Sequence, residues 1–209
     1  MIGALWERHV LPRVIRAACG SEAIMEMRAK VVPAATGAVF ELGCGGGLNQ
    51  RFYDTAAVSS FSGVDPSGKL LDYARGEAEK RGWAADIREG VGEDLPFASD
   101  SFDTAVCTYT LCSVDDPARV LAELRRVLKP GGRLLFLEHG RAPDAKVAKF
   151  QARLEPLWKR AMGNCHLTRP VKETVAAGGF QLEQPQGVYM EGMPRFAGWM
   201  EWGAAVKAG

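Results

Sequence analysis

The stretch AVFELGCGGGLNQ, residues 38–50, constrains the fold more than any other part of the chain. A short apolar run stops at a cluster of glycines, and a more polar segment, LNQRFYD, follows it. This order is typical of a buried parallel strand and a tight turn, and we expect a helix to begin in the segment after the turn. Because glycines let the backbone come close to a ligand, the turn is a candidate cofactor site.

Strand-like and helix-like runs alternate along the rest of the chain. Apolar strands separated by helices indicate a parallel sheet that is covered on both faces. We therefore predict an α/β, Rossmann-like fold with a mostly parallel seven-stranded sheet, helices on both faces and a C-terminal antiparallel hairpin. The expected strands are residues 38–42, 61–65, 84–90, 102–109, 132–140, 180–190 and 196–207, with helices at 67–81 and 116–132.

The length of 209 residues suits one domain. We expect an N-terminal helical cap over residues 1–37, a cofactor-binding core over 38–140, and acceptor-side helices with the final strands over 141–209. Lysine plus arginine (26) nearly balance aspartate plus glutamate (25), so no net field favours nucleic acid. The charged residues among the first twenty argue against a membrane-spanning segment or a signal peptide.

The five cysteines lie at positions 19, 44, 107, 112 and 165 and form no C-x-x-C pair. An odd number without paired spacing predicts neither a disulfide framework nor a zinc site. We therefore expect no metal and a reduced, cytoplasmic compartment.

The residues around the glycines discriminate between ligands. The dinucleotide fingerprint G-x-G-x-x-G would need a glycine at position 48, which is Leu48, and no phosphate-loop lysine follows. An acid before the glycines, Glu41, suits a ligand with an ammonium group. Asp65, about 20 residues on, can accept the hydroxyls of a ribose, although an aspartate there can also only cap the next helix. A nucleoside that carries an amino acid fits both acids, and S-adenosylmethionine is such a molecule.

Five segments resemble the ordered motifs of class I S-adenosylmethionine-dependent methyltransferases: ELGCGGG, VDPS, GEDLPF, SFDTAVCTYTLCSV and ARVLAELRRVLKPGGRLLFLEHG. More narrowly, LNQRFYD, CTYTLCSV, LEHG and GNCHLTR resemble the methyltransferase-like 7 group of alkyl-thiol methyltransferases. Bacterial phosphatidylethanolamine N-methyltransferases share the core and the DPARVLAE pattern. The acceptor is therefore less constrained than the donor.

The resemblance implies a binding site for S-adenosylmethionine, whose product is S-adenosylhomocysteine. Many class I members carry an aspartate where this chain has Val91, which moves the expected adenine contacts to the residues that follow. The implied cofactor-binding residues are Glu41, Gly43, Cys44, Gly45, Gly47, Asp65, Pro66, Gly92, Glu93, Asp94, Cys107 and Thr108.

The acceptor should lie near the carboxyl ends of the fourth and fifth strands, where the transferable methyl group points in this fold. His139 and His166 are the candidates to assist deprotonation of a thiol, and each can instead be a bystander. Cysteines such as Cys112 are more often small core residues than reactive groups. The candidate substrate-binding residues are Trp6, His9, Leu111, Cys112 and Trp158.

Residues 145–162 form an amphipathic segment rich in lysine and arginine. We expect a helix that packs on the sheet and closes the acceptor pocket; the alternative is contact with a membrane surface. The leading function is methyl transfer to a small lipophilic acceptor, most plausibly a thiol. The alternatives are phosphatidylethanolamine N-methylation and a non-catalytic S-adenosylmethionine-binding module. The sequence does not predict an oligomeric state.

Overall fold

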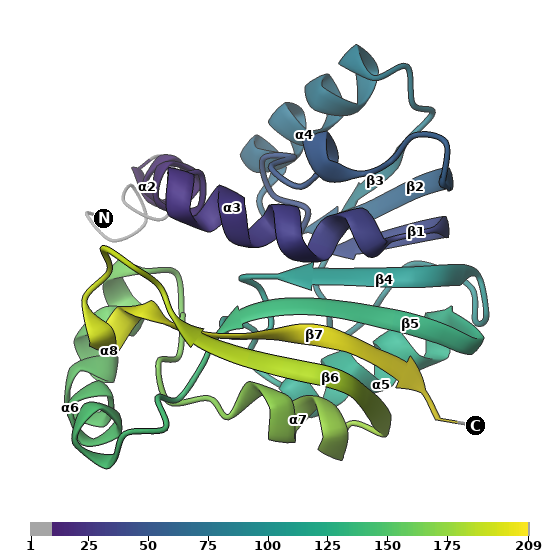
Figure 1. Ribbon diagram of the computed structural model, residues 1–209. Coiled ribbons are helices and arrows are strands. Elements are labelled where there is room, and N and C mark those ends of the chain that lie inside the picture. The colour runs from purple at the N-terminus through teal and green to yellow at the C-terminus, as the bar shows by residue number, and fades with distance from the viewer. Residues whose placement is uncertain (1–9, 209) are drawn as a thin grey trace.

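A seven-stranded sheet forms the centre of the molecule, with the strand order β3-β2-β1-β4-β5-β7-β6 (Figure 1). The structure, a computed structural model, describes residues 10–208. Strands β1 to β5 pair in parallel, whereas β7 is antiparallel to both β5 and β6. This confirms the predicted fold and its C-terminal hairpin. The strands are β1 Gly37–Leu42, β2 Val58–Asp65, β3 Asp86–Glu89, β4 Phe102–Thr108, β5 Leu128–His139, β6 Phe180–Tyr189 and β7 Trp199–Lys207.

Helices cover both faces of the sheet, as the apolar strands require (Figure 1). Side chains of α3 and α4 pack with Val39 and Phe61 in one buried cluster, and those of α5 and α7 pack with Phe40 and Phe136 in another. The helices are α2 Leu11–Cys19, α3 Glu22–Val31, α4 Gly68–Lys80, α5 Pro117–Val127, α6 Ala145–Ala161, α7 Val171–Ala177 and α8 Arg195–Gly198, with short 3-10 turns η2 Val32–Ala34 and η3 Gln50–Phe52.

The predicted helix after the glycine turn is wrong, because only η3 forms there. Two side chains of this segment point into the protein instead of lining a helix surface. Gln50 donates from Nε2 to the carbonyl of Ala74 in α4 at 2.9 Å, and the hydroxyl of Tyr53 donates to the carboxylate of Glu41. The chain then turns at Asp54 and enters β2 at Val58. These inward contacts leave no length for a regular helix.

The predicted boundary between α5 and β5 also moves. We expected the helix to run to the Pro130-Gly131-Gly132 sequence, but it ends at Val127 and β5 begins at Leu128. The register of β5 against β4 shifts between Phe102 and Thr104. Gly131 has a positive φ of 73°, so this tripeptide forms an irregularity inside the strand, where glycine tolerates the conformation.

Helices α2, α6 and α8 gather at one end of the sheet, on the left of Figure 1. We predicted that this segment packs on the sheet, but helix α6 does not cover a face of the sheet. It is anchored at this end of the sheet through the buried Gln151. The Gln151 side chain accepts from the backbone N–H of Ala142 at 2.9 Å and donates to the carbonyls of Gly140 and Phe196. Among residues 10–208, no helix has both the length and the apolar character needed to cross a membrane.

Candidate functional site

A cleft of about 560 Å³ opens at the carboxyl ends of the parallel strands. This is the edge at which open α/β sheets bind ligands. A smaller recess of about 90 Å³ shares Gly43, Asp65 and Tyr109 with the cleft and reaches Glu41 and Arg28. Together the two spaces form one candidate site. Its inner end carries charged groups of both signs, and its outer end is rich in sulfur.

Gly43 is required by the geometry of the turn after β1. Its φ is +66°, and a Cβ atom there would lie 2.0 Å from Oγ1 of Thr110. Gly45 also has a positive φ, and its backbone N–H donates to Oδ2 of Asp65 at 3.0 Å. Gly47 packs against α4 instead of lining the cleft, since a Cβ there would lie 3.1 Å from Cα of Ala74. The glycines therefore shape the turn and bring its backbone to the ligand edge.

Glu41 lies at the inner end of the site and is only 2% exposed. Its Oε1 accepts from Nδ2 of Asn49 at 3.0 Å, and its Oε2 accepts from the hydroxyl of Tyr53 at 2.7 Å. Burial raises the pKa of Glu41 to about 7 despite these two donors. A carboxylate in this state favours a cation close to it.

Arg28 is a cation whose charge acts on Glu41, and the sequence analysis missed it. It extends from α3 into the same recess, where its Nη1 donates to Oδ1 of Asn49 and to Oγ1 of Thr108, both at 2.6 Å. Its Nε is buried without a hydrogen-bond partner among the described residues. The guanidinium also lies 4.9 Å from the ring centre of Tyr109. A buried cation with a free donor suits an anionic ligand group.

Asp65 is at the end of β2 and is 8% exposed, facing the cleft. Its Oδ1 accepts from the N–H of Ser67 at 2.9 Å, and its Oδ2 accepts from the N–H of Gly45. Both readings of the sequence thus have a structural basis, because Asp65 holds the start of α4 and the glycine turn while it also lines the cleft. Each carboxylate oxygen retains a lone pair for a hydroxyl ligand.

The loop after β3 forms the next wall. Val91, Gly92 and Glu93 line the cleft, together with Pro66. Gly92 is packed tightly, since a Cβ there would lie 3.0 Å from a methyl group of Leu42. Asp94 is not among the lining residues, so the structure does not bring it to the cleft with its neighbours.

Sulfur and imidazole groups meet at the outer end of the cleft. The Sγ atoms of Cys112 and Cys165 are 3.7 Å apart, and Sγ of Cys165 lies 3.8 Å from Nδ1 of His139. The hydrogen bond between the two thiols lowers the pKa of Cys165 and raises the pKa of Cys112. The ring of Tyr109 meets His139 edge-on at 5.3 Å, and Trp158 and Met162 complete this wall.

Glu138 fixes the segment that carries Cys112. This fully buried carboxylate accepts from the backbone N–H groups of Thr110 and Leu111 at Oε1 and from that of Cys112 at Oε2, each at 3.0 Å. The thiol of Cys107 donates to the same carboxylate at 3.2 Å. Cys107 and Leu111 therefore lie in the core beneath the cleft and do not line it, contrary to expectation.

One further candidate, His166, has a different position from the one expected. His166 is not among the residues that line the cleft; its Nδ1 lies 3.2 Å from Oε1 of Glu155 in α6, whereas its neighbour Cys165 contacts Cys112 and His139. Thr108 and Cys44 line the inner recess. Trp6 and His9 lie outside the described residues.

Sequence reasoning missed Arg28, Asn49, Tyr53 and Cys165. Asn49 and Tyr53 lie in the LNQRFYD segment, where a helix was expected and no side-chain role was assigned. Cys165 lies in the GNCHLTR segment, in which the sequence analysis identifies only the neighbouring His166 as a candidate. Arg28 is preceded and followed by exposed or apolar helix residues, so no local signal marks it.

Comparison with known proteins agrees with this arrangement. Residues 40–136 match the family described as a methyltransferase domain. A thiol S-methyltransferase of Rattus norvegicus, TMT1B, is 38% identical over 150 residues, which cover 70% of this chain and 61% of the relative. A phosphatidylethanolamine N-methyltransferase of Cereibacter sphaeroides is 32% identical over 140 residues, covering 65% of this chain and 68% of the relative.

A solved structure supports the fold. A putative methyltransferase from Bacillus halodurans superposes with a TM-score of 0.71 and 18% identity, covering 88% of this chain and 99% of that one. The chain spans about three fifths of the length of the rat thiol methyltransferase that it matches. With its sheet order, its glycine turn behind Glu41 and these relatives, the chain belongs to the class I S-adenosylmethionine-dependent methyltransferases.

Proposed function

We propose that this protein transfers a methyl group from S-adenosylmethionine to a small lipophilic thiol. The observation that carries the proposal is the polarity of the cleft. Its inner end has the buried carboxyl group of Glu41 and the buried guanidinium of Arg28, and its outer end has sulfur, imidazole and apolar groups. The donor has matching polarity, with a zwitterionic amino acid at one end and a nucleoside at the other.

The inner recess suits the amino acid part of the donor. The carboxylate of Glu41 would receive the ammonium group, and the guanidinium of Arg28, whose Nε has no partner among the described residues, would receive the carboxylate. Both groups are already buried, so a zwitterion would satisfy charges that are otherwise costly in a low-dielectric site. Cys44, Gly43 and Gly45 would supply the adjoining backbone.

The middle of the cleft suits the nucleoside. Asp65 would accept hydrogen bonds from the ribose hydroxyls through its remaining lone pairs. Pro66, Val91 and Gly92 form an apolar wall for the adenine ring, and Glu93 lies at the edge of this wall. Asp94 and Gly47 are left out of the proposed contacts, as they do not line the cleft.

The outer end suits a lipophilic acceptor. Ile15 of α2, together with Trp158 and Met162, provides an apolar wall, and His139 and Cys112 lie beside it. Bound S-adenosylmethionine supplies an electrophilic methyl group on a sulfonium. The apolar wall would hold the acceptor in line with that group and exclude water from it.

A thiol reacts as the thiolate, and its unperturbed pKa is about 8.5. Nδ1 of His139 lies at the sulfur-rich end of the cleft, where it can accept the acceptor's proton. Tyr109 orients the imidazole through their edge-on contact. His139, and not His166, is therefore the histidine proposed to assist the reaction.

The test is methyl transfer from labelled S-adenosylmethionine to alkyl thiols and to alcohols and amines with the same alkyl chain. We expect label in the thioether, with a preference for longer alkyl chains that Trp158→Ala reduces. Equal labelling of the alcohols or amines would contradict the thiol assignment. Tight donor binding without turnover on any acceptor would instead favour a non-catalytic binding module.

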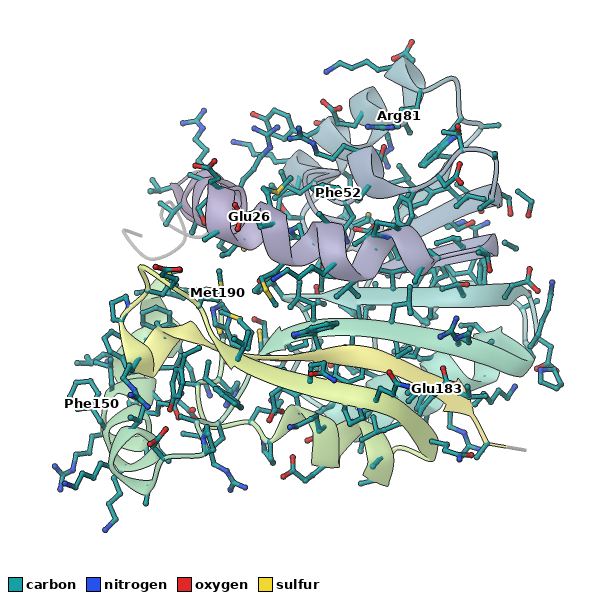
Figure 2. The ribbon with its side chains drawn as sticks, in the orientation of Figure 1. Glu26, Phe52, Arg81, Phe150, Glu183 and Met190 are labelled. Atoms are coloured by element: carbon teal, nitrogen blue, oxygen red, sulfur yellow. The ribbon has the colours of Figure 1, made fainter. Side chains whose placement is uncertain are left out.

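One observation favours a second candidate, phosphatidylethanolamine N-methylation. Helix α6 carries exposed apolar side chains, with Phe150, labelled in Figure 2, 50% exposed and Leu157 64% exposed. Exposed basic residues such as Lys149 and Arg153 lie in the same helix. Such a surface suits the headgroup region of an anionic membrane. This candidate requires vesicle binding that Leu157→Glu weakens, and methylated lipid as the product. A cytoplasmic location and the absence of a nucleic-acid partner remain predictions from composition.

A further inference from the structure

The cluster of Cys112, Cys165 and His139 has the composition of a transition-metal site. Nδ1 or Nε2 of His139 and the two Sγ atoms all lie within 4.8 Å of one another. Two thiolates and one imidazole are ligands that zinc takes in catalytic sites, where three protein ligands leave a fourth position open. The sequence predicted no such site, because 53 residues separate the two cysteines and the histidine lies between them.

Two of the three distances between ligand atoms are close to those around a tetrahedral ion. With zinc–sulfur bonds of about 2.3 Å, two sulfur ligands of a tetrahedral ion are about 3.8 Å apart. The observed separation of the Cys112 and Cys165 sulfurs is 3.7 Å, and Sγ of Cys165 is 3.8 Å from Nδ1 of His139. A disulfide needs its sulfur atoms about 2.05 Å apart, so the observed pair is not a disulfide; two hydrogen-bonded thiols at this spacing can share an ion without a large movement.

The segments that carry the ligands are tied to each other. The backbone N–H of His166, next to Cys165, donates to the carbonyl of Cys112 at 2.8 Å. Nδ2 of Asn164 donates to the carbonyl of Ser113 at 2.9 Å. The carboxylate of Glu138 holds the N–H of Cys112 from below. These bonds keep the two cysteines together without the ion, which is the preorganisation that a metal site needs.

The open side of the cluster faces the cleft. Cys112, Cys165 and His139 all line it, together with Trp158. Two thiolates and a divalent ion sum to zero charge, which suits this largely buried position. We propose that Cys112, Cys165 and His139 bind one Zn²⁺ or similar divalent transition-metal ion whose fourth position opens into the acceptor end of the cleft.

The role of this ion rests on the proposed thiol methylation. In the metal-bound protein the ion replaces His139 as the group that activates the thiol, because an imidazole nitrogen bound to a metal cannot accept a proton. An acceptor thiol at the fourth position would release its proton to solvent and bind as the thiolate. Its sulfur would then form a bond to the methyl carbon, the bond from that carbon to the sulfonium sulfur would break, and the bonding electron pair would stay on the donor sulfur. The neutral thioether product is a weaker ligand than a thiolate and would leave the ion.

Metal binding can be tested without any acceptor. The full chain, stripped with a chelator and kept reduced with a phosphine, is titrated with Co²⁺, which gives visible d–d bands and near-ultraviolet sulfur-to-metal charge transfer in such sites. We expect one ion per chain, displaceable by Zn²⁺. Cys112→Ser, Cys165→Ser and His139→Ala should each weaken binding at least about 100-fold. Cys19→Ser, a cysteine of the same cleft outside the cluster, should leave it unchanged.

Binding of S-adenosylhomocysteine serves as the control for correct folding, and each variant should retain it. Wild-type protein that shows no charge-transfer band, or bands that survive both cysteine substitutions, would overturn the metal site. Full thiol methylation by chelator-stripped protein would overturn the role proposed for the ion and leave the proposed function intact. Metal binding without methylation of any thiol would support the site and remove the thiol assignment.

Discussion

The hydroxyl of Tyr53 donates a 2.7 Å hydrogen bond to Oε2 of Glu41, a carboxylate that is almost completely buried at the inner end of the cleft. Tyr53 comes from the segment after the glycine turn, and Glu41 comes from the strand before it. The turn therefore brings the carboxyl group of Glu41 and the hydroxyl group that donates to it together at the inner recess. The charge state of Glu41 should then control donor binding.

Donor affinity should depend on pH through Glu41. Burial raises the pKa of Glu41 to about 7, and an ammonium ligand needs the ionised form. Lowering the pH from about 7.5 to about 6 should therefore weaken S-adenosylmethionine binding by roughly tenfold, as measured by calorimetry. Glu41→Gln should bind more weakly and without this pH dependence. The exposed Glu26→Gln, labelled in Figure 2, should behave like wild type; an unchanged pH profile in Glu41→Gln would contradict the assignment.

Arg28 should make the protein prefer a donor that carries a carboxylate over one that lacks it. Decarboxylated S-adenosylmethionine lacks this group, so wild-type protein should bind it about tenfold or more weakly than S-adenosylmethionine, in line with about 1.5 kcal/mol or more for a charge-assisted hydrogen bond. Arg28→Met should bind both molecules with the same affinity. If Arg28→Met keeps the full preference, another group receives the carboxylate. Retained binding of adenosine would show that the variant is folded.

Gly43→Ala should abolish donor binding because the turn cannot hold a side chain. The substitution combines a φ of +66° with a Cβ 2.0 Å from Oγ1 of Thr110. Gly82→Ala separates the two effects, since Gly82 has a φ of +69° but no atom within 4 Å of the added Cβ. Gly82→Ala should lower the free energy of unfolding by about 1–2 kcal/mol and leave donor binding intact. Equal effects of the two substitutions would contradict the close approach at Gly43.

Glu138→Gln should destabilise the fold. The carboxylate accepts three backbone N–H bonds on both oxygens, and a glutamine would face one of those donors with its own NH₂ group. We expect the free energy of unfolding, measured in urea, to fall by about 1.5–3 kcal/mol. Glu183→Gln removes an exposed partner of Arg133 and should change it by less than about 1 kcal/mol. A similar loss in both variants would show that Glu138 does not organise the segment around Cys112.

Much of this fold could be predicted because its signals are local. The buried run before Gly43 and the apolar pattern of α5 each follow from a few neighbouring residues, and both elements formed. The helix after the glycine turn failed because Gln50 and Tyr53 make long-range contacts that no local pattern records. Tertiary contacts therefore overrode the expected alternation of strands and helices in this segment.

The residues of the candidate site that end strands could be predicted from the sequence, whereas those on helices and turns could not. Glu41 and Asp65 end strands, where ligands bind in this architecture, so their positions follow from the topology. Arg28 and Cys165 reach the cleft from a covering helix and from the turn after α6, and their placement depends on packing between distant segments. The neighbouring residues Cys165 and His166 contact different groups, Cys112 and Glu155 respectively, and only the three-dimensional structure separates them.

The most direct measurement is a competition in one tube. The protein receives S-adenosylmethionine with a deuterated methyl group, together with equal amounts of an alkyl thiol and phosphatidylethanolamine vesicles, and mass spectrometry identifies the labelled product. The thiol assignment predicts the deuterated methyl group in the thioether, with the lipid unlabelled. Label in the phosphatidylethanolamine, with the thiol unchanged, would contradict it.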